Sequence, residues 1–128
     1  ARGAYNAIGP DYMLDMAALL HGIRASTTAG ATLTFVPADF LEAQNVSPWG
    51  DMPVWVPNSG DSAGFHTRSN AKAIAAGLTF RSIADTTAAT LAWFDAQPEE
   101  RRKAGSRAGI KAEREAEVLA AWKAKRVP

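Results

Sequence analysis

The sequence contains no cysteine and only two histidines among its 128 residues. A disulfide framework and a thiolate metal site are therefore impossible. His21 falls on a mostly apolar predicted helix, which favours a packed or partly exposed side chain over a metal ligand. His66 follows Asp61 and Ser62 closely, but closeness in sequence is poor evidence for a catalytic triad. Because the histidines do not have an HExxH-type spacing either, we expect no metal site.

The chain also lacks a long hydrophobic run and a strong charge of either sign. No apolar segment approaches the roughly 18 residues that a membrane helix requires, and no signal peptide is recognisable. The net charge of +1 gives no basic field that would recruit nucleic acid or a membrane. We therefore expect a cytoplasmic chain that binds neither. Its opening at Ala1-Arg2-Gly3, without an initiator methionine, suggests a piece of a longer protein.

Two further kinds of site are missing as well. A dinucleotide site needs a glycine-rich turn between a strand and a helix, and the glycines at 60–64 and 105–109 have the spacing of plain surface turns. A tyrosine that acts as acid or base needs a nearby cation, and neither Tyr5 nor Tyr12 is followed by a lysine four residues later. We predict no catalytic and no cofactor-binding residue in this chain.

The first forty residues predict mixed secondary structure. Ala4–Ile8 and Ala31–Val36 are strand-like, the second because it is rich in β-branched and aromatic residues. Between them, Asp15 is the better of two candidate N-caps for a helix that ends near Ser26, since it places the apolar residues on one face. Pro37 suits the first turn of a short helix that continues through Phe40 and Leu41.

Residues 69–97 predict two helices separated by a short extended connector. Ser69 is a plausible N-cap for the first helix, and Gly77 supplies the left-handed residue that ends it. Ser82, with Asp85 three positions later, has the pattern of a capping box that opens the second helix. Pro98 then closes that helix after about Gln97.

Outside these helices the sequence predicts a flexible, proline-rich loop at 46–64, a basic connector at 98–109 and a last helix at about 111–125. The Arg and Lys residues of the connector are offset by Glu99 and Glu100, which is typical of a solvated segment. The fold class that follows is α/β, or α+β-like, with short strands and about five helices in one domain, 1–128.

Large aromatic side chains are concentrated at the proline-rich loop, where Trp49, Trp55 and Phe65 occur. Two interpretations stay open. The residues are either a lid of loop packed over the domain core or one wall of a small-molecule pocket. Arg68 follows closely and is suited to bind a carboxylate or phosphate, although a surface arginine near a helix start is the commoner case.

Several short segments carry a family resemblance. They are, in chain order, Gly3–Pro10, Thr34–Val36 leading to Phe40–Leu41, Ser47–Trp49, Val54–Pro57, Ala73–Arg81 (AIAAGLTFR) and Thr90–Phe94 (TLAWF). Together they resemble the C-terminal part of bacterial extended short-chain dehydrogenases/reductases. The group that they resemble most is the NAD-dependent epimerase/dehydratase group, often labelled isoflavone-reductase-like oxidoreductases. The resemblance covers nearly the whole chain.

The resemblance implies a substrate-binding part separated from its catalytic part. In such enzymes the N-terminal Rossmann part binds NAD or NADP and supplies a Tyr-x-x-x-Lys pair, and the C-terminal part shapes the substrate pocket. The implied partners are therefore that Rossmann part and a small-molecule substrate, and a homodimer is compatible. By position, Trp49, Trp55, Phe65, His66 and Arg68 are the implied substrate contacts. The alternative function is a free-standing interaction module that binds a partner protein through the Trp49–Trp55 loop.

Overall fold

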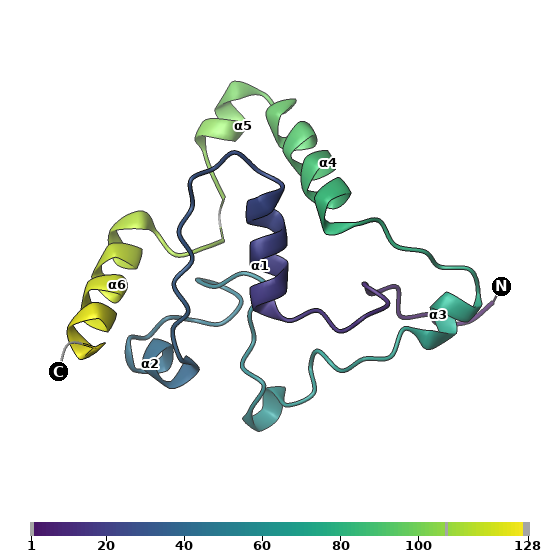
Figure 1. Cartoon of the computed structure of the whole chain (residues 1–128), viewed down its shortest axis with the longest axis horizontal. Helices are drawn as coiled ribbons and strands as arrows, with labels where there is room; N and C mark the ends of the chain where they lie inside the picture. The colour runs from purple at the N-terminus through teal and green to yellow at the C-terminus, as the bar shows by residue number, and fades with distance from the viewer. Residues whose placement is uncertain (1, 107, 127–128) are drawn as a thin grey trace. The chain divides into compact units, whose positions relative to one another are not determined.

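The computed structural model describes residues 2–106 and 108–126, and helices account for nearly all of their regular structure (Figure 1). The elements are, in order, α1 (Met16–Ala25), α2 (Ala38–Ala43), a 3₁₀ turn η1 (Gly60–Ser62), α3 (Ala71–Ala75), α4 (Ile83–Asp95), α5 (Glu99–Lys103) and α6 (Ala112–Arg126). The chain divides into two compact units. Unit 1 combines residues 1–33 with 66–104, and unit 2 combines residues 34–65 with 105–128.

The two predicted strands are not found, and this corrects the strand component of the α/β expectation, whereas its helices are present. In the described part of the chain the only β-type pairing is an isolated bridge between Pro48 and Met52. A strand needs a partner strand to pair with its backbone groups, and local propensity does not supply one. In Ala4–Ile8, carbonyl groups accept hydrogen bonds from side chains instead: the Ala4 oxygen from Lys72 Nζ at 2.9 Å and the Ile8 oxygen from Asn70 Nδ2 at 2.8 Å.

The predicted helix caps of α1 and α4 are confirmed. Asp15 accepts a hydrogen bond from the Ala18 amide at 2.7 Å, and Ser82 accepts one from the Asp85 amide at 3.0 Å. The Ser82 hydroxyl also donates to the Asp85 carboxylate at 2.7 Å, so serine and aspartate hold each other at the first turn of α4. Each cap satisfies an amide that has no partner within its helix.

The start of α3 differs from the prediction by one residue. Asn70, not Ser69, is the N-cap, and it makes no side-chain capping bond. Its amide group instead donates to the carbonyl oxygens of Ile8 and Pro10 at 2.8 and 3.0 Å. Gly77 follows α3 with φ of +100°, the left-handed conformation that was expected of it.

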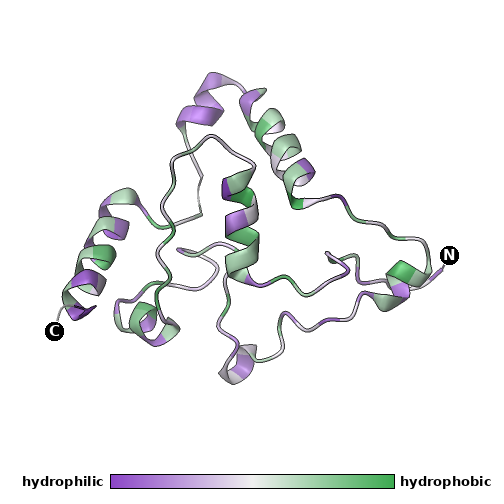
Figure 2. Cartoon of the chain, viewed as in Figure 1, coloured by the Kyte–Doolittle hydropathy of each residue, from purple (hydrophilic) through white to green (hydrophobic). Residues whose placement is uncertain are grey.

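A second correction concerns the basic connector, because Glu99–Lys103 forms the short helix α5. Its acidic residues lie in the first turn and its basic residues in the last, which favours a helix through its dipole. The Lys103 Nζ and a Glu99 carboxylate oxygen are 2.6 Å apart. Figure 2 shows α5 as mainly hydrophilic, in contrast to the apolar residues on α1 and α4.

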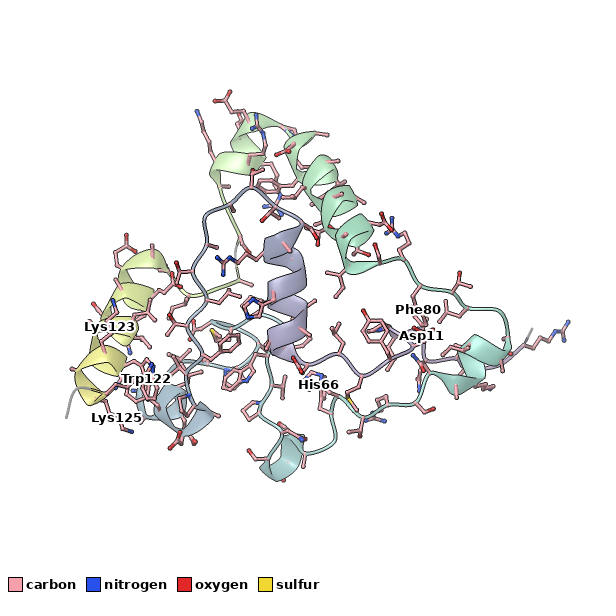
Figure 3. All side chains as sticks on the ribbon, in the orientation of Figure 1. Asp11, His66, Phe80, Trp122, Lys123 and Lys125 are labelled. Carbon is pink, nitrogen blue, oxygen red and sulfur yellow. The ribbon has the colours of Figure 1, made fainter. Side chains whose placement is uncertain are left out.

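Unit 2 contains the hydrophobic core. Phe40, Leu41, Val46 and Val118 are buried together, and the partly buried side chains packed against them include Trp55 and Trp122. The Phe40 and Trp122 rings have their centroids 5.0 Å apart, and Figure 3 shows Trp122 on the α6 helix. The predicted last helix is found as α6, and its Val118 is buried in this cluster. None of the described helices combines the length and apolar character needed to cross a membrane.

Candidate functional site

A cavity of about 580 Å³ lies within unit 1. Three separate stretches of chain line it: the Gly9–Tyr12 region, α1 with the residues just after it, and the segment from Thr79 to Leu91 that contains the first turns of α4. The volume is within the range of roughly 300–1,000 Å³ that small-molecule sites occupy. The cavity is therefore the candidate functional site of this unit.

Helical spacing determines which side chains reach the cavity. From α1 come Leu19 and Ile23, which are four residues apart and so lie on one face. From α4 come Ile83, Thr86, Thr87, Thr90 and Leu91, which recur at the three- and four-residue intervals of a single helical face. One wall of the cavity is thus aliphatic, and the other mixes aliphatic groups with threonine hydroxyls.

Two glycines set the geometry of the walls. At Gly22 in α1, a Cβ would lie 3.2 Å from a methyl carbon of Ile83, so the two helices approach closely where this residue has no side chain. At Gly9, a Cβ would lie 2.4 Å from a ring carbon of Phe80, so the Phe80 ring packs directly on the backbone. Figure 3 labels Phe80 and Asp11 in this part of unit 1.

Hydroxyl groups supply most of the polar side chains in the cavity lining, and charge is sparse. The Thr90 hydroxyl donates to the Thr86 carbonyl at 2.8 Å, which leaves its oxygen lone pairs as acceptors toward a ligand. Arg81 is the only charged residue in the described lining, and it forms no ion pair with another described residue. The lining has no aspartate or glutamate.

The five predicted substrate contacts are divided between the units. Trp49, Trp55 and Phe65 belong to unit 2, whereas His66 and Arg68 belong to unit 1 and are exposed. None of the five is part of the described lining of the unit 1 cavity. Their role as substrate contacts stays a prediction. Among the five, the structure brings the rings of Trp49 and Phe65 into contact.

Within unit 2, the aromatic loop has two environments. Trp55 packs against the buried core, as the lid interpretation expects. Trp49 is 61% exposed, and its ring meets that of Phe65 edge-on with a centroid distance of 6.2 Å. The backbone joins the two tryptophans, since the Trp49 amide donates to the Trp55 carbonyl at 3.0 Å. Trp49 also has a φ of +63°, which is uncommon for a residue other than glycine.

A lysine close to a tyrosine is present, although the sequence spacing did not predict it. Lys72 Nζ lies 4.6 Å from the centre of the Tyr5 ring and donates to the Ala4 carbonyl. It faces the ring rather than pairing with the hydroxyl as a catalytic dyad requires. No group of three or more potential metal ligands occurs among the described residues.

A smaller space of about 410 Å³ lies in unit 2, lined by Gly50, Asp51, Lys111 and Arg114 with their neighbours. Main-chain hydrogen bonds join its two sides, from the Gly109 amide to the Gly50 carbonyl at 2.9 Å and from the Ile110 amide to the Asp51 carbonyl at 2.8 Å. Arg114 donates to the Gln44 carbonyl and pairs with Glu117, so its charge is already used within unit 2.

Comparison of the chain with protein-family models, with curated proteins and with solved structures found no match.

Proposed function

We propose that the chain is the substrate-binding C-terminal part of a bacterial NAD(P)-dependent oxidoreductase or epimerase, and that it works in the cytoplasm beside a Rossmann part of the same parent protein. The observation that carries the proposal is the cavity of unit 1, which is concave, mainly apolar and of small-molecule size. The segments of the family resemblance include its Gly9–Pro10 and Thr79–Arg81 walls.

Exposed apolar side chains give further support. In unit 1, Met13 is 96% exposed, Trp93 59% and Tyr12 57%. Where such groups form a contiguous patch, they mark a surface that a neighbour or ligand covers. A Rossmann part is the neighbour that this proposal requires.

The segment around Gly60 does not fit a nicotinamide dinucleotide. The segment before Gly60 is not a strand, and the helix that follows is a single 3₁₀ turn, so no helix N-terminus faces a glycine-rich turn there. In the proposed enzyme the cofactor is therefore bound by the Rossmann part. The work of this chain is to bind the substrate, to exclude water from its apolar portion and to select which substrate fits.

One observation favours the alternative function, an interaction module that binds a partner protein through the Trp49–Trp55 loop. Trp49 combines high exposure with an unusual left-handed backbone, and tryptophans are common anchors of protein interfaces. This function needs no nucleotide-binding part.

A cofactor titration separates the two functions. The chain alone should leave NADH and NADPH fluorescence unchanged, because the proposal assigns the nucleotide site to the Rossmann part. The longer product of the encoding reading frame should bind one of them and oxidise it when a carbonyl substrate is supplied. Micromolar binding of NAD(P)H by the chain alone would contradict the proposed division of labour, and a reading frame without an upstream glycine-rich loop would favour the interaction module.

A further inference from the structure

We propose that the cavity of unit 1 binds an amphipathic carboxylate, with the apolar body between α1 and α4 and the carboxylate on Arg81. This inference deepens the proposed function by naming a substrate class, and it rests on that function only for the role of the ligand as a substrate.

The apolar walls of the cavity favour a ligand with an apolar body. Leu19 and Ile23 face the cavity from α1, and Ile83 and Leu91 face it from α4. Ile23 and Leu91 are 37% and 42% exposed, so they retain apolar surface that a ligand can remove from water. Burial of such surface is the main favourable term in binding an apolar group.

The negative charge is indicated by Arg81. It is the one cation in the described lining, and no carboxylate of the described residues lies within ion-pair distance of it. The nearest acidic residue in sequence, Asp85, accepts a hydrogen bond from the Ser82 hydroxyl at 2.7 Å. A guanidinium presents two parallel N–H groups that match the two oxygens of a carboxylate.

The threonines add polar contacts without adding charge. Thr86, Thr87 and Thr90 lie along one face of α4 and offer hydroxyl oxygens to the cavity. A cationic ligand would find no carboxylate in this lining to pair with, and it would meet Arg81 as a like charge. The lining therefore favours an anion over a neutral ligand, and a neutral ligand over a cation.

The test is a titration of the ¹⁵N-labelled chain, followed by NMR, with three probes that share one alkyl chain: decanoate, decan-1-ol and decylammonium. Each is used below the concentration at which it forms micelles. We expect saturable shifts at amides of residues 19–27 and 79–91, with decanoate binding about fivefold more tightly than decanol because Arg81 is partly solvated. Decylammonium should bind most weakly.

Two variants and one control test whether the charge of Arg81 causes the preference for decanoate over decanol. Arg81→Gln should abolish the difference between decanoate and decanol, and it should leave the fold intact because the side chain is exposed. Thr90→Glu, which adds a carboxylate to the lining, should make decanoate the weaker of the two. Arg24→Gln removes the same charge from a part of α1 outside the described lining, and it should leave the preference unchanged.

Equal affinity for the three probes, or shifts concentrated at Trp49 and Phe65 in unit 2, would overturn the inference. The proposed function has a separate readout. If decanoate fails to bind but the longer product oxidises NAD(P)H, the ligand class is wrong and the oxidoreductase proposal stands. If decanoate binds through Arg81 but the longer product binds no NAD(P)H, the cavity assignment stands and the oxidoreductase proposal fails.

Discussion

The two units use their apolar residues in different ways. Unit 2 buries Phe40, Leu41, Val46 and Val118 in one cluster, each 7% exposed or less. In the described part of unit 1, Ala73 is the one hydrophobic residue that is buried to this extent, and the larger apolar groups are half-buried or exposed. The comparison teaches that unit 2 has a buried core of its own, whereas the large apolar side chains of unit 1 stay at least partly exposed.

The largest expected effect is in the core of unit 2. Phe40→Ala should lower the free energy of unfolding by about 3–5 kcal/mol, because it removes a buried ring and leaves a cavity against Trp122. Urea denaturation followed by tryptophan fluorescence measures this, since three of the four tryptophans, Trp49, Trp55 and Trp122, belong to unit 2.

The matched control is Phe94→Ala in α4, where the ring is 38% exposed. Its cost should be well below that of Phe40→Ala. Equal costs for the two variants would mean that the units do not differ in the way the burial indicates.

An intermediate effect is expected at the cavity wall of unit 1. Gly9→Ala places a methyl group 2.4 Å from the Phe80 ring, so the ring must move, at a cost of about 1–3 kcal/mol for an overpacked site. Thermal unfolding, with NMR shifts of residues 79–81 as a local probe, checks it. Gly30→Ala is the control, because no heavy atom lies within 4 Å of the added Cβ, and an equally large loss there would rule out the steric explanation.

The smallest effect is expected at the N-cap of α4. This helix forms one wall of the cavity. Ser82→Ala removes the acceptor of the Asp85 amide and should cost about 1 kcal/mol. Ser59→Ala is a matched change at an N-cap that makes no side-chain capping bond, and it should cost less. Circular dichroism during thermal unfolding compares them, and a Ser59 variant as destabilised as the Ser82 variant would show that the capping bond contributes nothing.

The parts of the fold that could be predicted are those encoded locally. Asp15, Ser82 and Gly77 mark helix ends by bonds or dihedral angles within a few residues, and the structure places the ends there. The strands at Ala4–Ile8 and Ala31–Val36 failed because strand formation depends on a distant partner. The helix α5 was missed because its charges were interpreted as solvation, although their order along the segment suits a helix.

The cavity could not be predicted for a related reason. Its walls come from three stretches separated by up to about seventy residues, and only the tertiary fold brings Gly9 against Phe80 or Gly22 against Ile83. The threonines of α4 at three- and four-residue spacing were the one local signal, since they put hydroxyl groups beside aliphatic ones on a single helical face. The sequence instead indicated a binding site at the loop with Trp49, Trp55 and Phe65, because these large aromatic residues lie close together in the chain.

Filling the cavity between α1 and α4 should also raise the thermal stability of unit 1. A molecule that fills it and binds only the folded form raises the unfolding free energy by mass action, by about 2.7 kcal/mol when its concentration is a hundred times its dissociation constant. The melting temperature of unit 1 should therefore rise with the concentration of such a molecule.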